Sequence, residues 1–94
     1  SNSGDQSVVA AKSAIIKIIG QEASSKSEAA QEFQQAADKL LSADPILKYE
    51  NGKITKYNKD TKKKLLEQAS LFDKKNRTRI ASRIKSLFAD QPTQ

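Results

Sequence analysis

The chain has 94 residues, a net charge of +6 and neither cysteine nor histidine. Without these two residue types it lacks the ligands of Cys/His zinc sites, disulfide frameworks, thiol nucleophiles and imidazole acid–base catalysis. We therefore expect a non-enzymatic protein with no cofactor or metal. The length predicts one small domain, which buries only about 60–65% of the surface that its unfolded chain exposes.

The charge is divided unevenly along the chain. Residues 1–44 contain four lysines against six acids, whereas residues 45–94 contain thirteen Lys and Arg against five acids. The boundary falls at Pro45. The basic second half indicates affinity for a polyanion such as nucleic acid, or for an acidic protein surface.

The first predicted element is a helix. Residues 1–6 are polar, and we expect them to form a flexible tail or tether. Apolar residues recur at helical spacing from Val8 to Ile19, so a helix is predicted there, ending near residues 20–23. The isoleucines also fit a strand, but the alanines and the length favour a helix. Val9 and Ile16 widen its apolar arc, which indicates either the central helix of the domain or a surface for homo-oligomerisation.

The second predicted helix has the clearest amphipathic pattern, with its apolar face between residues 29 and 41. Ser25 and Glu28 match the S-x-x-E capping box, so we expect Ser25 to cap this helix. The alanines of the apolar face allow close packing against the first helix as an antiparallel pair. The helix ends before Pro45, because the residue that precedes a proline is disfavoured in a helix.

A β-hairpin is predicted from about residue 46 to residue 57. The pattern alternates on both sides of Asn51-Gly52, and both of these residues accept the positive φ of a type I′ turn. A two-residue loop fixes the register, which gives the pairs Glu50–Lys53, Tyr49–Ile54, Lys48–Thr55 and Leu47–Lys56. The buried face of the hairpin is then formed by Leu47, Tyr49 and Ile54.

Two further helices are predicted in the basic half. Asn58 or Asp60 is placed to cap the first of them, whose apolar face consists of Leu65, Leu66, Ala69 and Phe72. Asp73 is placed to cap the second, which includes Ile80, Ile84, Leu87 and Phe88.

A single helix over residues 61–88 is the alternative, because neither Gly nor Pro interrupts this stretch. No core residue occurs between Phe72 and Ile80, and this gap favours a break or bend near Asp73. Residues 89–94 are expected to form a second tail.

These elements together predict an all-α fold of four helices with one central β-hairpin, in the order α-α-β-β-α-α. We expect a single small helical domain over residues 7–88. The order also resembles a helix-turn-helix followed by a wing, but the second helix exposes Glu28, Glu32 and Asp38, which phosphates would repel.

Eleven cations of the basic half are the candidate anion-binding residues. They are Lys53, Lys56, Lys59, Lys62, Lys63, Lys64, Lys74, Lys75, Arg77, Arg79 and Arg83. Clustered cations neutralise phosphates and release counterions, which gives affinity without sequence readout. The alternative is a solvated face that keeps the protein soluble. Three consecutive lysines at a helix start oppose the helix dipole, and this cost favours a functional role.

The sequence therefore predicts a small non-enzymatic binding module whose basic second half docks on a polyanion. Two alternatives stay open: an extracytoplasmic or lipid-tethered protein-interaction domain, and a helical scaffolding or oligomerisation protein. Anion binding implies a cytoplasmic location, whereas a signal sequence or lipidated cysteine before Ser1 would imply an extracytoplasmic one. The sequence contains no apolar stretch of transmembrane length.

Overall fold

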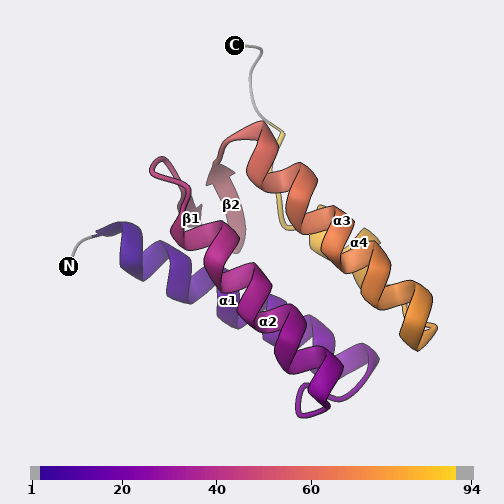
Figure 1. Ribbon diagram of the computed structural model, residues 1–94. Helices are drawn as coiled ribbons and strands as arrows, with labels where there is room; N and C mark the ends of the chain where they lie inside the picture. Colours follow the sequence, from indigo (N-terminus) through magenta and orange to yellow (C-terminus); the bar gives the residue numbers. More distant parts are fainter. Residues whose placement is uncertain (1–2, 91–94) are drawn as a thin grey trace.

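The computed structural model describes the backbone of residues 3–90 and the side chains of residues 6–90. In this part of the chain, four helices flank one antiparallel hairpin in the order α-α-β-β-α-α (Figure 1), which confirms the predicted fold class. The elements are α1 (Ser3–Glu22), α2 (Glu28–Ser42), β1 (Lys48–Glu50), β2 (Lys53–Lys56), α3 (Lys59–Asn76) and α4 (Ile80–Lys85).

The helices enclose a single core. α1 packs on α2, α2 on α3 and α3 on α4, and α4 returns to contact α1. Figure 1 shows α2 and α3 at the front with α1 and α4 behind them, and the hairpin at one end, where β1 contacts α1. The largest fully buried side chains are Ile15, Ile19, Leu41, Ile54, Leu65, Ile80 and Ile84. They come from every helix and from β2, so the core holds all the elements together.

The first helix is longer than predicted. α1 begins at Ser3, so residues 3–6 belong to the helix and not to a tail, while residues 1 and 2 lie outside the described part. No proline interrupts this stretch, so helical hydrogen bonding can continue beyond the apolar residues. The buried Ser7 then meets the hairpin, because its Oγ accepts a hydrogen bond of 3.1 Å from the backbone N–H of Tyr49.

The cap of α2 is Ser27, and the prediction of Ser25 was wrong. The Oγ of Ser27 accepts a hydrogen bond of 3.1 Å from the backbone N–H of Ala30. The helix begins at Glu28, two residues later than the capping box requires. The carbonyl of Ser25 instead accepts a hydrogen bond of 3.0 Å from the side-chain amide of Gln34.

The hairpin has the predicted turn but a different register beyond its tip. Asn51 and Gly52 have φ angles of 54° and 79°, as the type I′ turn requires. The pairs Tyr49–Ile54 and Glu50–Lys53 are confirmed.

The next predicted pairs are wrong, because a β-bulge at Thr55 brings Lys48 opposite Lys56. One extra residue reverses the side of the sheet to which the following side chains point. Lys56 is therefore exposed, and Tyr57 is buried in the core with 5% of its surface exposed.

The last two helices are separate, with the break later than expected. α3 continues through Asp73 to Asn76, and the chain turns at Arg77, which has a left-handed φ of 56°. Asp73 still caps α4, but from inside the last turn of α3. Its carboxylate accepts hydrogen bonds of 2.7 and 2.8 Å from the backbone N–H groups of Ile80 and Ala81.

The end of the described chain is extended and not helical. α4 stops at Lys85, and Phe88 forms a parallel bridge with Ile54. The backbone N–H of Ile54 donates to the carbonyl of Leu87 at 2.7 Å, and that of Ala89 donates to the carbonyl of Ile54 at 2.9 Å. Leu87 and Phe88 were predicted to be helical, because their spacing from Ile84 also fits a helix face. Pairing with the free edge of β2 overrides that pattern.

Candidate anion-binding surface

The structure divides the eleven predicted cations into three groups. The entry cluster lies where β2 leads into α3 and consists of Lys56, Lys59, Lys62, Lys63 and Lys64. The junction cluster lies at the end of α3 and in the loop to α4 and consists of Lys74, Lys75, Arg77 and Arg79. The remaining two cations, Lys53 and Arg83, lie beside α1.

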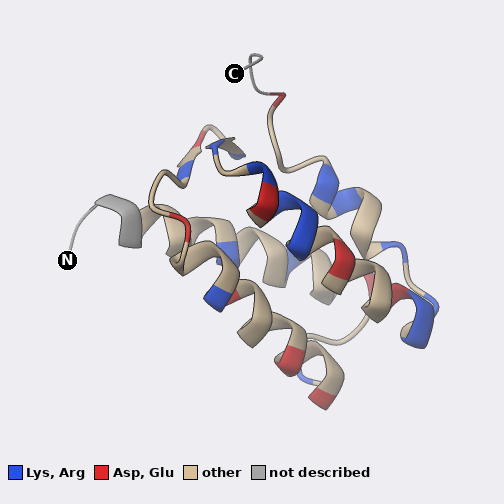
Figure 2. Ribbon diagram, turned by 45° about the horizontal axis from the view of Figure 1, so that its top comes forward, with Lys and Arg blue, Asp and Glu red and all other residues tan. Residues whose placement is uncertain are grey.

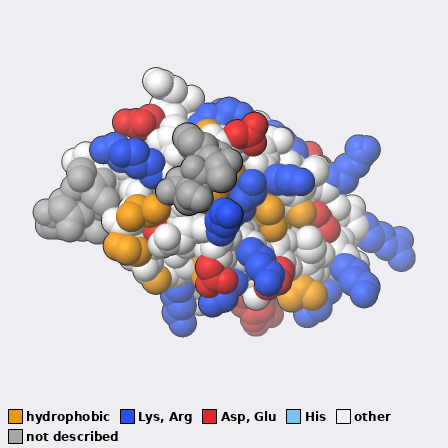
Figure 3. All heavy atoms as spheres, turned by 90° about the horizontal axis from the view of Figure 1, so that it is seen from above, with side chains coloured by type: hydrophobic (Ala, Val, Ile, Leu, Met, Phe, Trp, Pro, Cys, Tyr) orange, Lys and Arg blue, Asp and Glu red, His pale blue; other side chains and the backbone are white. Residues whose placement is uncertain are grey.

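The two clusters occupy opposite ends of α3 (Figure 2). The helix has 18 residues, so its length is about 27 Å at about 1.5 Å per residue. Seen from above, Lys and Arg side chains are spread over the surface with acidic groups between them (Figure 3). On the face that Figure 3 shows, the basic half therefore does not form one continuous positive surface.

One lysine of the entry cluster lies over two aromatic rings. The Nζ of Lys62 lies 5.8 Å from the ring centroids of both Tyr57 and Phe88, within the range of cation–π attraction. Lys64 forms an ion pair of 3.0 Å with Asp60, one turn earlier, and both side chains are largely exposed. Such an exposed pair contributes little to stability.

Tyr57 anchors this cluster and is not a platform for bases. Its hydroxyl donates a hydrogen bond of 2.6 Å to the carbonyl of Ala89, and its ring packs edge-on against Phe88 at 4.9 Å. Burial raises the pKa of the Tyr57 phenol above its usual value, and the negative charge of Asp90 raises it further. The phenol therefore stays neutral, and the ring is not free to stack on a nucleobase.

The four side chains of the junction cluster are exposed and make no ion pair within the described residues. The carboxylate of Asp73, which precedes them in the chain, binds the backbone of α4 and also accepts a hydrogen bond of 2.6 Å from the hydroxyl of Thr78. Asp73 is thus held by uncharged donors, and its orientation is fixed toward α4. This arrangement leaves the neighbouring cations able to meet an external anion.

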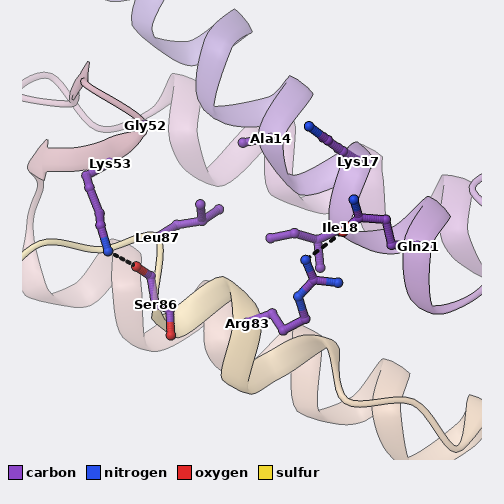
Figure 4. Close-up of a pocket in the computed structure, with 9 residues that line it drawn as sticks. All are labelled: Ala14, Lys17, Ile18, Gln21, Gly52, Lys53, Arg83, Ser86 and Leu87. Carbon is purple, nitrogen blue, oxygen red and sulfur yellow. Dashed lines mark hydrogen bonds between the residues drawn. The ribbon is translucent and has the colours of Figure 1, made fainter.

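Lys53 and Arg83 are bound to the protein itself (Figure 4). The Nζ of Lys53 donates to the carbonyl of Ser86 at 2.8 Å. The guanidinium of Arg83 binds the carboxylate of Glu22 at 3.1 Å and the side-chain carbonyl of Gln21 at 2.6 Å. Lys53 thus links β2 to the end of α4, and Arg83 links α4 to α1. Because both side chains are already bound, they are poorer candidates for anion ligands than the cations of the junction cluster.

A shallow hollow of about 450 Å³ separates Lys53 from Arg83. Ile18 and Leu87 point into it, and Lys17 of α1 lies at its edge (Figure 4). Lys17 belongs to the acidic half of the sequence, so charge counting along the chain could not group it with the other two. Only the packing of α1 against α4 brings it there.

The apolar arc of α1 is only partly used by the core. α1 contacts α2, α4 and β1, as expected of a central helix. Val9 nevertheless stays 63% exposed, and Ile16 is half-buried.

Neither a metal site nor a membrane span is found in the described part of the chain. Among the residues whose side chains are described, no three acidic groups gather closely enough to hold a metal ion. No helix within residues 3–90 combines the length and the apolar character that a membrane span needs. Comparison with protein-family models, with curated proteins and with solved structures gives no match for this chain.

Proposed function

We propose that the protein is a small non-enzymatic binding module that docks on a polyanion such as nucleic acid without reading its sequence. The observation that carries this proposal is the junction cluster. Its four cations are exposed and free of ion pairs within the described residues, while hydrogen bonds hold the nearby Asp73 toward α4. Because Asp73 caps α4, its carboxylate does not neutralise these cations, which supports a role in binding an external anion.

The entry cluster supplies the second contact. The two clusters are separated by roughly the length of α3, about 27 Å. Successive base pairs of a DNA duplex rise about 3.4 Å, so a ligand that reaches both clusters along α3 spans about eight base pairs. We therefore expect duplexes shorter than this to bind more weakly than longer ones.

The burial of the tyrosine rings supports binding without sequence readout. Sequence is read through base edges in the grooves or through exposed aromatic rings, whereas phosphate contacts carry no sequence information. Tyr57 is buried and Tyr49 is half-buried, so neither tyrosine ring is free to stack on a base. Binding should therefore vary little with base composition.

The test is the salt dependence of binding to a 16-base-pair DNA duplex. If each of the four junction cations contacts one phosphate, the slope of log K against log salt has a magnitude of at least about 4, and the double variant R77Q/R79Q should reduce this magnitude by about 2. The control K17Q/K39Q removes the same charge outside both clusters and should change the slope little. Binding that is absent at low salt, or that is insensitive to salt, would refute the proposal.

A further inference from the structure

The outer face of α3 carries a row of three adjoining hollows between the two basic clusters, and the middle hollow, lined by Leu66 and Leu71, is mainly apolar. Three hollows adjoin along the helix and share residues: Leu66 and Lys63 line both the first and the second, and Leu71 lines both the second and the third. The row begins beside Tyr57 and ends beside Phe33 of α2, so it follows the whole length of α3. We name this surface the α3 track.

Two leucines of the track face solvent at least in part. Leu71 is 56% exposed and Leu66 is half-buried, although Leu65 and Phe72 beside them already fill the core. Lys63, Glu67, Ser70 and Lys74 follow one another at three- and four-residue spacing and thus share the same face. The helix therefore presents two leucines inside a frame of charged residues, an arrangement that the apolar face of a second helix can cover.

The charges of the track identify the partner. Five lysines and three carboxylates line it: Lys59, Lys62, Lys63, Lys74 and Lys75, with Glu32, Glu67 and Asp90. The excess is positive, and lysines stand at both ends of the leucines. We propose that the α3 track binds an acidic amphipathic helix of a partner protein, whose apolar side chains cover Leu66 and Leu71. These lysines also belong to the entry and junction clusters, so a polyanion and this partner compete for them, whereas the contact with Leu66 and Leu71 is separate from polyanion binding.

The dimensions of α3 set the pattern of this partner. Lys63 and Lys74 are eleven positions apart, which is about 16 Å along the helix axis. A partner helix that lies parallel or antiparallel to α3 can meet both lysines if it carries two acids about eleven residues apart. Eleven residues make about three helical turns, so the two acids lie on the same face of the partner helix. Its leucines then fall between the two acids, as in other helix-in-groove complexes.

Glu67 argues against a lipid surface as the occupant. It lies between Leu66 and Leu71 in the middle of the track, where a bilayer would take its carboxylate out of water at high cost. A narrow helix covers the two leucines and leaves an exposed carboxylate at its edge in water. Glu67 is thus compatible with a bound peptide and unfavourable for membrane docking.

The experiment is a display selection with an 18-residue helical peptide library. The library fixes leucines along one face and encodes Glu, Lys or Ser at each flanking position. We expect selection on the intact protein to enrich glutamates near eleven-residue spacing. The enriched peptide should bind L71S about tenfold or more weakly than the unmodified protein, because one buried leucine is lost. The control V9S removes an equally exposed apolar residue from α1 and should bind normally.

Three outcomes would overturn the inference. The first is enrichment without a preference for acids, and the second is peptide binding that L71S leaves unchanged while circular dichroism shows both proteins folded. The third is binding to vesicles of anionic phospholipid that L71S abolishes, which would assign the track to a lipid surface. Loss of DNA binding in R77Q/R79Q with normal peptide binding would support this inference separately from the polyanion proposal.

Discussion

Asp44 holds Asn58, fourteen residues further along the chain, by two hydrogen bonds of 2.8 Å. One comes from the backbone N–H of Asn58 and the other from its side-chain amide. The same carboxylate accepts a third hydrogen bond, of 3.1 Å, from the backbone N–H of Ile46. Asp44 is 6% exposed and thus joins the end of α2, the entry to the hairpin and the start of α3. Asn58 occupies the predicted N-cap position of α3. Its side-chain amide binds Asp44, and the side chain makes no capping hydrogen bond to α3.

Replacing Asp44 by alanine should lower the free energy of unfolding by about 2–4 kcal/mol, because three donors lose a charged acceptor in a buried place. Urea denaturation followed by circular dichroism measures this change. The control D60A breaks an exposed ion pair with Lys64 and should cost no more than about 0.5 kcal/mol. Equal effects of the two substitutions would contradict the bridging role of Asp44.

Replacing Arg77 by glycine should raise stability while weakening polyanion binding. Arg77 has a left-handed φ of 56°, which costs a residue with a Cβ about 1 kcal/mol and costs glycine almost nothing. The matched variant R79G removes the same charge at a φ of −125°, where glycine brings no such relief. We expect R77G to unfold at higher urea concentration than R79G, and both to reduce the salt slope of DNA binding by about 1. The same midpoint for both variants would show that Arg77 is unstrained.

Alkaline pH should destabilise the protein through Tyr57. Its folded-state pKa is raised, so the folded protein retains a proton that the unfolded chain releases near pH 10. The stability that comes from the neutral phenol is complete below about pH 10 and is lost as the pH rises toward the folded-state pKa. Thermal melting from pH 8 to 11 should show a steeper decline for the protein than for Y57F, which cannot ionise there. Parallel declines would mean that another group controls alkaline unfolding.

Truncating Phe88 to alanine should cost about 3–5 kcal/mol, because its buried ring packs on Tyr57 and its backbone closes the edge of β2. Chemical denaturation of F88A measures the loss. The neighbouring L87A serves as the control: Leu87 is only half-buried, and its carbonyl bond to Ile54 survives the substitution. If L87A were as damaging as F88A, the aromatic contact would not be the source of the stability.

Local signals predicted the elements well wherever one pattern acted alone. The amphipathic face of α2 and the turn at Asn51-Gly52 needed no tertiary information. Two of the errors occur where a distant partner decides the outcome. The bulge at Thr55 turns Tyr57 into the core, and the edge of β2 draws Phe88 out of a helical pattern. The bulge and the bridge both depend on residues far away in the sequence, and the local hydrophobic pattern carries no information about them.

The candidate surface shows the same limit. The sequence groups the cations by their position along the chain, but it does not show which of them are bound to other residues of the protein. Nothing in the pattern around Arg83 reveals that Glu22 and Gln21 meet it across the core, and Lys17 joined its hollow only through helix packing. The exposure of Leu71 was also missed, because Leu71 lies next to the core residue Phe72 and its own orientation depends on where α2 packs.

The parallel pairing of Ile54 with Phe88 bears on how the chain acquires its structure during synthesis. The hairpin leaves the ribosome before the segment that pairs with it, so the outer edge of β2 is open at that stage. Ala89 follows Tyr57 by 32 residues. Until then the nascent chain displays unpaired strand backbone, which is where edge-to-edge association begins. α3 and α4 must be translated before that edge is sealed, so the domain completes its fold as one late cooperative event and not stepwise from its first helix.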